Sequence, residues 1–389
     1  MKLFVLLSRV PYPIEKGDKL RAFHQIRCLS VKHEIILCAL SEGKLHPGAL
    51  TILKKYCKEV HVIPIGKAGM LWNLLKTFFN GKPMQTGYFY RRTAKSKILS
   101  LINKSKPDHI YCQLLRVAGY VSEVPVPKTL DYQDVFSIGM KRRMETSSRW
   151  MKPLLNFEYK RLSRYENLVF GLFDHTTIIS SPDRDLIGHP KRQEIAIVPN
   201  GVDHQYFAPL DCPKTYELVF TGNMGYPPNI NAAEFLTKEI FPLVRKEFPS
   251  ARLLIAGANP HARVLALQSD FTTVSGWIPD IRESYACSKI FIAPMQIGTG
   301  LQNKLLEAMS MKIPCITSRL ANTALGARET EEILVGTSAG DYAGHILHLL
   351  NNRAEADKMA QRGYEFVRNT YDWEKSTAIL ENLMFSKPV

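Results

Sequence analysis

The stretch from Lys289 to Ser318 constrains the fold of this chain most strongly, because it predicts one complete β-α-β unit. Lys289–Pro294 is a short β-branched and aromatic run, which is typical of a buried parallel strand. Leu301–Met311 repeats apolar residues at the 3.6-residue period of a helix packed on a sheet. Pro314 ends this helix, and Ile313–Thr317 predicts the next strand. A parallel α/β architecture follows.

A glycine loop joins the first strand of this unit to its helix: Gly298, Thr299 and Gly300. The free N–H groups and positive dipole end of the helix would face an anion, typically a phosphate.

Lys304 and Glu307 share roughly one helix face with Asn303, close to this loop. Lys304 would supply a counter-charge to the phosphate, and the Glu307 carboxylate would accept hydrogen bonds from ribose hydroxyls. An ordinary ion pair on a solvent-exposed helix face is the alternative.

This segment resembles the donor-binding segment of retaining glycosyltransferases of family 4, and its Gly-x-Gly-x-x-Asn-Lys-x-x-Glu form resembles exopolysaccharide and exosortase-associated sugar transferases. The resemblance implies an α/β GT-B fold, with two Rossmann-like, doubly wound domains facing a central cleft. The family carries two glutamates eight residues apart. The second matches Glu307 and is implied to hold the ribose of a nucleotide sugar. The first falls on Thr299, which departs from the pattern.

The length of 389 residues predicts two domains, each large enough for its own core. No run of about 18 apolar residues indicates a membrane span. The apolar run Leu3–Leu7 is too short for a signal peptide and predicts the first strand.

The sequence contains seven cysteines, and their spacing is not that of metal ligands. They predict mostly buried free thiols in a reducing compartment.

The net charge of +15 is concentrated in the first half of the chain. Residues 1–200 hold 33 Lys and Arg against 16 Asp and Glu, whereas residues 201–389 hold 18 against 20. This asymmetry predicts that the first domain alone faces a polyanionic surface.

The segment between Glu59 and Asp108 contains no acidic residue and nine basic ones. Its apolar residues recur at helical spacing, as in a segment that lies on an anionic bilayer. The residues predicted to contact the membrane are Trp72, Lys76, Phe78, Phe79, Arg91 and Arg92. Alternatively, the apolar stripe packs into the first domain and the lysines are solvated. Nucleic acid is disfavoured because no recognised binding module is present.

The first half alternates strands and helices, as in a doubly wound parallel sheet. Strands are expected at Leu3–Leu7, His33–Ala39, Tyr56–Ile63, His109–Cys112 and His175–Ser180, and helices at Lys19–Val31, Ala94–Lys104 and Met140–Phe170. The first strand-to-helix loop is a ligand position in such sheets, although the dinucleotide fingerprint is absent. Gly17 lies in this loop, and the resemblance places such a glycine near the donor pyrophosphate or the acceptor.

Asp131 and Asp134 lie at a predicted strand end within Lys128–Asp134. The resemblance places acceptor-binding and active-site groups there, and Asp134 is the candidate catalytic carboxylate of this half. Either aspartate could instead cap the following helix. Arg116 is a weaker acceptor candidate, together with His24 and Gln113.

The second half repeats the strand and helix alternation after a turn at residues 199–203 and a linker at Pro209–Thr215. The expected domains are residues 1–207 and 208–371, with a final helix in 372–389 that returns to the first domain. Strands are expected at Ile195–Val202, Leu218–Thr221, Ala251–Gly257 and Thr272–Ser275, and helices at Ile230–Phe248, Ile281–Ser288 and Asp372–Phe385.

The resemblance extends donor binding over the second half. It implies that Gly222 and Asn223 lie under the donor phosphates, that Trp277 and Ile278 read the base, and that Gly298, Thr299, Gly300, Leu301, Asn303, Lys304 and Glu307 complete the site. Lys304 and Glu307 are also the candidate catalytic residues. The family usually carries an Arg and a Lys after the first loop, but residues 224–231 contain neither. We therefore expect Lys304, the helix dipole and Arg319 to neutralise the diphosphate.

The expected function is transfer of a sugar, with retention, from a UDP- or GDP-linked donor to a hydroxyl of a lipid-linked or polysaccharide acceptor. The enzyme would be peripheral on the cytoplasmic face of the membrane. Metal independence and the absence of a cofactor are expected, because no metal-binding Asp-x-Asp follows a strand. A nucleotide-sugar epimerase of the same fold and a non-catalytic nucleotide-sugar or lipid-binding protein are the alternatives.

Overall fold

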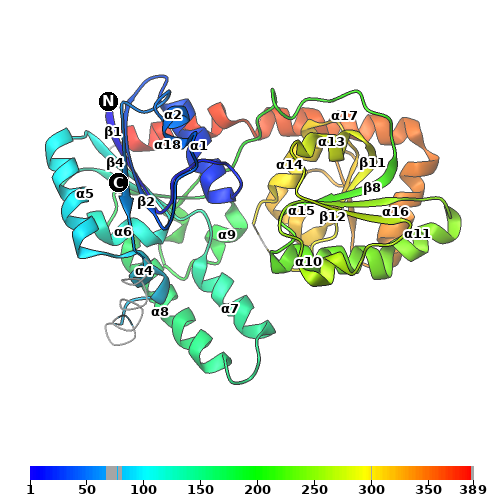
Figure 1. Cartoon of the computed structure of the whole chain (residues 1–389), viewed down its shortest axis with the longest axis horizontal. Helices are drawn as coiled ribbons and strands as arrows, with labels where there is room; N and C mark the ends of the chain where they lie inside the picture. The colour runs from blue at the N-terminus through cyan, green and yellow to red at the C-terminus, as the bar shows by residue number, and fades with distance from the viewer. Residues whose placement is uncertain (67–76, 78–80, 299, 387–389) are drawn as a thin grey trace. The chain divides into compact units, whose positions relative to one another are not determined.

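The computed structural model describes residues 1–66, 77, 81–298 and 300–386. The chain divides into two compact units, Met1–Pro199 with Trp373–Val389, and Asn200–Asp372. We call them unit 1 and unit 2 (Figure 1). The first division falls after Pro199, earlier in the chain than the boundary expected after residue 207.

Unit 1 contains a seven-stranded parallel sheet in the order β3-β2-β1-β4-β5-β6-β7. The strands are β1 Lys2–Leu7, β2 Glu34–Ser41, β3 Glu59–Pro64, β4 His109–Gln113, β5 Lys128–Asp131, β6 His175–Ile178 and β7 Ala196–Ile197. The doubly wound parallel sheet is confirmed. β7 is much shorter than predicted, because its partner β6 ends at Ile178 and Ser180 already caps helix α9 (Ser181–Asp185).

Helices cover both faces of this sheet (Figure 1). They are α1 Gly17–Leu29, α2 Ala49–Leu53, α4 Met84–Phe89, α5 Arg92–Ser105, α6 Leu115–Val121, α7 Phe136–Thr146, α8 Lys152–Phe170, α9 Ser181–Asp185, a 3-10 turn Arg192–Glu194, and α18 Trp373–Phe385. The prediction of one helix over Met140–Phe170 is wrong. The chain breaks between α7 and α8, and Pro153 in the first turn of α8 is compatible with a helix start but not with a helix interior.

The C-terminal helix α18 belongs to the core of unit 1. Leu380 and Met384 are buried among residues of β1, β2 and α1. The Trp373 ring stacks on the His24 ring of α1 with centroids 4.9 Å apart. His33 and Lys32 both contact the Glu381 carboxylate, at 2.9 and 3.0 Å. Apolar burial and these polar contacts together fix α18 against the N-terminal part of unit 1.

Unit 2 contains a six-stranded parallel sheet in the order β10-β9-β8-β11-β12-β13 around one hydrophobic core. The strands are β8 Tyr216–Thr221, β9 Leu253–Ala256, β10 Thr272–Gly276, β11 Ser288–Ala293, β12 Cys315–Ser318 and β13 Leu334–Gly336. The helices are α10 Pro227–Phe235, a π-helical turn Leu236–Ile240, α11 Phe241–Glu247, α12 Ala262–Leu265, α13 Ile281–Ala286, α14 Asn303–Ser310, α15 Arg319–Leu325, α16 Ala339–Asn351 and α17 Arg353–Thr370.

The β-α-β unit expected at residues 289–318 is confirmed as β11, α14 and β12. The helix expected over Ile230–Phe248 is present but irregular. It starts at Pro227 and passes through the π-helical turn before α11. Pro242 lies in the first turn of α11 and cannot donate a helical hydrogen bond, which accounts for the altered bonding there.

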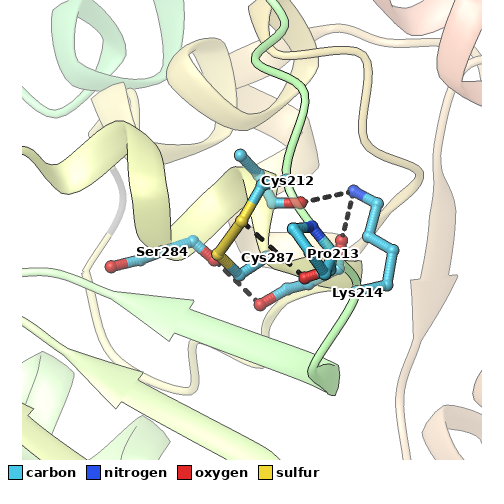
Figure 2. Close-up of a disulfide and its surroundings, with 7 residues drawn as sticks. Cys212, Pro213, Lys214, Ser284 and Cys287 are labelled. Carbon is cyan, nitrogen blue, oxygen red and sulfur yellow. Dashed lines mark hydrogen bonds between the residues drawn. A yellow bond between two sulfur atoms is a disulfide. The ribbon is translucent and has the colours of Figure 1, made fainter.

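A disulfide corrects the expectation about the cysteines. Cys212 and Cys287 are bonded across 75 residues (Figure 2). The Lys214 ammonium donates hydrogen bonds to the carbonyls of Ala286 and Ser288, at 2.7 and 2.8 Å. The segment before β8 is thus tied to the junction of α13 and β11. The other five cysteines, Cys28, Cys38, Cys57, Cys112 and Cys315, lie outside this disulfide, and all of them except Cys28 are buried.

None of the described helices has the length and apolar content needed to cross a bilayer. Trp72, Lys76, Phe78 and Phe79, predicted to contact a membrane, lie outside the described residues. Arg91 and Arg92 are described and lie at the start of α5.

Candidate functional site

The carboxyl edge of the unit 2 sheet carries two glycines at close backbone contacts. Gly222 follows β8 with φ +152°, and a Cβ there would lie 2.7 Å from Asn229 Nδ2. Gly257 follows β9 with φ +142°, and a Cβ there would lie 1.8 Å from the Gly222 carbonyl oxygen. Side chains are therefore excluded where these two loops pass each other at the carboxyl edge of the sheet, which is where parallel sheets of this kind bind ligands.

Lys304 lies beside this glycine turn without a carboxylate partner among the described residues. Its ammonium donates to Asn229 Oδ1 at 2.5 Å and lies 4.9 Å from the Phe220 ring centroid. Asn229 is held in turn, because its Nδ2 donates to the Asn223 carbonyl at 2.9 Å. Burial lowers the pKa of Lys304 to about 7, only partly opposed by Glu307. A partly desolvated cation of this kind favours an incoming anion.

Glu307 stands one turn further along α14 and is oriented by a chain of hydroxyls. The Tyr285 hydroxyl donates to Glu307 Oε2 at 2.7 Å. The same hydroxyl lies 2.7 Å from Thr221 Oγ1. Because the tyrosine proton is used on the carboxylate, the threonine hydroxyl is the donor of the second bond. Burial raises the pKa of Glu307, while the Tyr285 hydrogen bond and Lys304 lower it.

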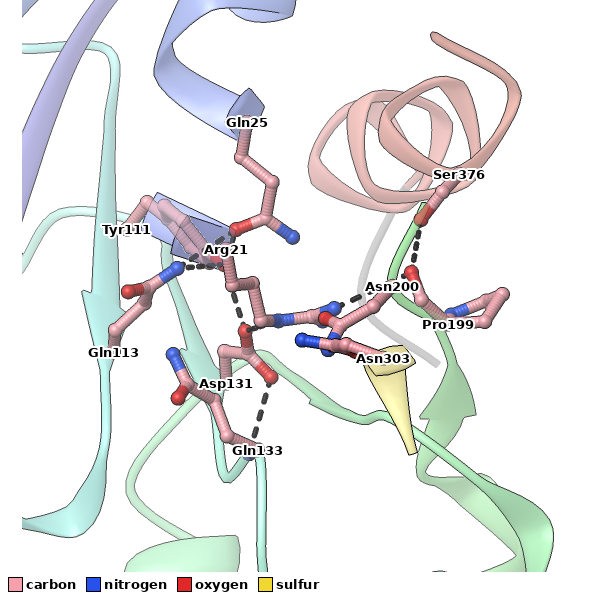
Figure 3. A network of polar contacts seen from close by, with 10 residues as sticks. All are labelled: Arg21, Gln25, Tyr111, Gln113, Asp131, Gln133, Pro199, Asn200, Asn303 and Ser376. Carbon is pink, nitrogen blue, oxygen red and sulfur yellow. Dashed lines mark hydrogen bonds and ion pairs between the residues drawn. The ribbon is translucent and has the colours of Figure 1, made fainter. Parts of the chain in front are cut away.

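The start of α14 presents backbone N–H groups without a side-chain cap. Gln302 is the N-cap residue, but its side chain donates to the Gly300 carbonyl at 2.9 Å rather than capping the helix. Gly298 has φ +103°, so the loop before α14 also requires glycine. Asn303 Oδ1 accepts a hydrogen bond from Asn200 Nδ2 at 3.0 Å, which ties the first helical residue to the 199–203 turn (Figure 3). The orphan N–H groups suit an anion.

The remaining donor candidates of unit 2 occupy different surroundings. Trp277 is 66% exposed just after β10, whereas Ile278 and Leu301 pack against the core. Thr299 lies outside the described residues. Arg319 pairs with Glu329 at 3.3 Å, so this cation already has a carboxylate partner. Of the cations expected to neutralise a diphosphate, Lys304 is therefore the better placed.

Asp131 of unit 1 is buried in an ion pair, contrary to the expectation that it contacts an acceptor. Its Oδ2 accepts from Arg21 Nε at 2.6 Å and lies 2.9 Å from the Tyr111 hydroxyl (Figure 3). Its Oδ1 accepts from the Gln133 N–H at 3.2 Å. Asp131 and Arg21 are both fully buried, so this carboxylate organises the end of β5 and has no surface for a ligand.

Asp134 is exposed in the loop before α7, and its Oδ1 accepts from the Val135 N–H at 2.7 Å. Glu166 is the buried carboxylate nearby, and it accepts from the Ser137 N–H at 2.9 Å. Burial chiefly, together with Asp134, raises the pKa of Glu166 to about 7. Gly17 begins α1, and a Cβ added there would meet no atom within 4 Å. Arg116 lines a cavity of unit 1. Within the described residues, no three His, Cys, Asp or Glu side chains gather as metal ligands.

Sequence reasoning missed three residues that orient the predicted pair: Thr221, Tyr285 and Asn229. Each is buried, with 0–5% of its surface exposed. Thr221 could have been found from the sequence, because it is a polar residue at the end of a predicted buried strand. Asn229 precedes the helix expected at Ile230–Phe248, and Tyr285 lies within the helix expected at Ile281–Ser288. Spacing alone does not distinguish their amide and hydroxyl from polar groups at the edge of the core.

The chain is similar to known proteins in sequence and in structure. Residues 215–352 match the family described as glycosyl transferases group 1. A 44.6 kDa protein in the cps region of Klebsiella pneumoniae is 21% identical, over 96% of this chain and 97% of that protein. Sucrose-phosphate synthase from Thermosynechococcus elongatus superposes with a TM-score of 0.71 at 13% identity, covering 98% of both chains. Anabaena HepE, solved in complex with UDP-glucose, gives a TM-score of 0.69 at 12% identity, covering 98% of this chain and 99% of that one.

The expected fold class is thereby confirmed, since these structural neighbours are GT-B glycosyltransferases. The described candidate donor residues of unit 2, Gly222, Asn223, Trp277, Ile278, Gly298, Gly300, Leu301, Asn303, Lys304 and Glu307, all lie within the matched region. The chain has the GT-B fold, and residues 215–352 of its second unit are similar to the glycosyl transferases group 1 family.

Proposed function

We propose that this chain is a retaining glycosyltransferase that takes a sugar from a UDP- or GDP-linked donor. The observation that carries the proposal is Lys304, a partly desolvated ammonium at the uncapped start of α14. Among the described residues it has an amide partner, Asn229, but no carboxylate partner. A diphosphate would supply the missing negative charge and accept from the free N–H groups. The group 1 match over residues 215–352 supports the same assignment.

Glu307 is proposed to bind the donor ribose. Tyr285 occupies Oε2, and Oε1 has no hydrogen-bond partner among the described residues. A carboxylate held by one hydroxyl chain can accept hydroxyl hydrogen bonds at its other oxygen with little loss of side-chain entropy. Asn229 would keep the Lys304 ammonium near the diphosphate, since the two side chains are already in contact.

In the proposed reaction, the bond between the anomeric carbon and the diphosphate oxygen breaks. A bond forms to the acceptor oxygen on the same face of the sugar, and the proton of the acceptor hydroxyl passes to the departing diphosphate. Lys304 and the start of α14 would stabilise the negative charge that develops on the leaving diphosphate. No metal or cofactor is required in this proposal. Asp134, as the exposed carboxylate of the β5–α7 loop, remains the proposed catalytic group of unit 1.

The acceptor is proposed to be a lipid-linked or polysaccharide hydroxyl at the cytoplasmic face of a membrane. The basic excess of residues 1–200 supports attraction of unit 1 to an anionic surface. The similarity to a protein in a cps region supports a role in polysaccharide synthesis.

Thermal unfolding with UDP, GDP, ADP and CMP tests the donor site. A ligand at about 100 times its dissociation constant stabilises the folded state by roughly 2.7 kcal/mol. We expect one nucleoside diphosphate to raise the melting temperature of the wild type and to have little effect on Glu307→Ala. The exposed residue Glu247 of α11 provides the matched control, because Glu247→Ala removes the same charge from the same unit.

Incubation of the matching nucleotide sugar without acceptor then tests catalysis. Slow release of free sugar in its original anomeric form supports retaining transfer and excludes a non-catalytic binding protein. Release of an epimerised sugar would instead support the epimerase alternative. If no nucleotide shifts the melting temperature, the donor site itself is refuted.

A further inference from the structure

Unit 1 contains a cavity of about 470 Å³ that none of the donor residues lines. Its lining residues come from α4, α5, α6 and α8 and from the segments next to them. Its volume is within the range of small-molecule sites, roughly 300–1,000 Å³. The cavity is therefore large enough for a substantial part of a ligand.

The lining of this cavity is strongly basic. Four cations contribute to it, namely Lys82, Arg91, Arg92 and Arg116, and no described Asp or Glu is among the lining residues. None of the four forms an ion pair with a described residue. A concave surface lined by one sign of charge attracts counter-ions more strongly than the same charges on a flat surface.

Arg116 is the most constrained of these cations. Its guanidinium lies between two rings, with its Cζ 4.9 Å from the Phe89 centroid and 5.0 Å from the Phe136 centroid. It donates to Gln85 Oε1 at 3.4 Å, and its buried Nε has no partner among the described residues. Burial lowers the pKa of Arg116 to about 10. The group is thus held in place, partly desolvated and able to donate further hydrogen bonds.

The start of α5 adds backbone donors to the same cavity. Arg91 is its N-cap residue and makes no side-chain cap hydrogen bond, and the first turn contains no acidic residue. Arg91, Arg92 and Thr93 all line the cavity. The positive end of a 14-residue helix therefore faces the space that the four cations surround.

From this arrangement we infer that the cavity is a binding site for a phosphate or diphosphate group carried by the acceptor. Guanidinium groups bind phosphate oxygens in a bidentate manner, and the α5 N–H groups and the Thr93 hydroxyl add neutral donors. The phosphate could belong to a lipid head group or to a soluble phosphorylated glycan. The acceptor role rests on the proposed function, whereas the binding of phosphate does not.

Calorimetric titration of inorganic pyrophosphate into the full chain tests this site. Lys82 and Arg92 are exposed, so Lys82→Gln/Arg92→Gln removes two cavity charges at little risk to folding. Lys97→Gln/Lys104→Gln is the matched control, since it removes two exposed charges of α5 that do not line the cavity. We expect the first pair to weaken binding about tenfold or more and the control pair to weaken it much less.

Lys304→Met separates this site from the donor site. If pyrophosphate binding is lost in Lys304→Met but is unchanged in the cavity pair, the cavity proposal is overturned and the donor site stands. If the cavity pair loses pyrophosphate while no nucleotide stabilises the wild type, the cavity stands and the donor proposal fails. Equal loss in the cavity pair and the α5 control pair would also overturn the proposal, because net charge would then explain the binding.

Flotation with phosphatidylcholine vesicles, with and without phosphatidic acid, identifies the source of the phosphate. For a lipid head group, the cavity pair should lose binding to the acidic vesicles, and pyrophosphate should compete with them. For a soluble phosphorylated acceptor, the cavity pair should lose pyrophosphate but bind the vesicles as the wild type does. Either pattern supports a phosphate site in this cavity.

Discussion

The Tyr285 hydroxyl donates a 2.7 Å hydrogen bond to Glu307 Oε2, and Thr221 completes the chain from the end of β8. Tyr285 is fully buried, so this bond is made where water does not compete. These hydrogen bonds connect the end of β8, helix α13 and helix α14 at Glu307, the carboxylate proposed to bind the donor ribose.

Tyr285→Phe should weaken nucleotide binding more at pH 6 than at pH 8. The Tyr285 hydrogen bond lowers the pKa of Glu307, so its loss raises that pKa further and leaves more of the carboxyl protonated in mild acid. We expect a loss of about 1–3 kcal/mol in the free energy of unfolding as well, because Thr221 and Glu307 lose their common partner. Binding titrations at both pH values check this.

Tyr216→Phe is the control for Tyr285→Phe, since the Tyr216 hydroxyl makes no hydrogen bond to a described residue. Its ring lies under Arg252, with 5.3 Å between the centroid and Cζ, and remains in the variant. An equal loss of affinity at both pH values in Tyr285→Phe would contradict the proposed effect on Glu307.

Gly222→Ala should destabilise unit 2 and weaken diphosphate binding. Its φ of +152° is strained for alanine, and the new Cβ would lie 2.7 Å from Asn229 Nδ2 and 3.4 Å from Lys304 Nζ. We expect a cost of about 1–3 kcal/mol in unfolding free energy. Gly344→Ala in α16 meets no atom within 4 Å and should instead stabilise by about 0.4–1 kcal/mol. Denaturant titration of both variants measures these free energies. An unfolding free energy of Gly222→Ala equal to that of the wild type would refute the close contact with Asn229.

The affinity for a nucleoside diphosphate should fall as the pH rises above about 7. Lys304 has a pKa of about 7 before binding, and a bound diphosphate would raise it. Below pH 7 the ammonium is already charged, so this group adds no pH dependence. Between the free and bound pKa values the protein must take up a proton on binding, and affinity falls up to about tenfold per pH unit.

Calorimetry at pH 8 in buffers of different ionisation enthalpy measures that proton uptake directly. Lys304→Met should abolish the uptake, whereas Lys289→Met removes an exposed lysine of the same unit and should leave it unchanged. Proton uptake that persists in Lys304→Met would assign the effect to another group.

Asp131→Asn should cost about 3–5 kcal/mol in unfolding free energy, because it removes the carboxylate that neutralises the buried Arg21 guanidinium. Urea unfolding followed by circular dichroism measures this loss. Asp185→Asn, at a largely exposed carboxylate, should cost at most about 1 kcal/mol. The nucleotide-induced rise in melting temperature should persist in Asp131→Asn, since the proposed donor site lies entirely in unit 2. A small cost in Asp131→Asn would show that the pair is not buried in solution.

The sequence by itself determined the parallel α/β class, the β-α-β unit at 289–318 and the candidate pair Lys304 and Glu307. These features depend on local periodicity, glycine loops and neighbours three residues apart, all of which are readable along the chain. The tertiary structure decided the partners. Lys304 meets Asn229 across 75 residues, and Arg21 meets Asp131 across 110.

Such long-range contacts arise because parallel strands bring their carboxyl ends to one edge of a sheet, whatever their order in the chain. The sequence could place Asp131 at a strand end, because that position depends on its neighbours in the chain. Its burial could not be predicted, because it depends on the distant residue Arg21. The Cys212–Cys287 disulfide likewise became visible only once the chain was folded. The break between α7 and α8, in contrast, has a local signal in Pro153.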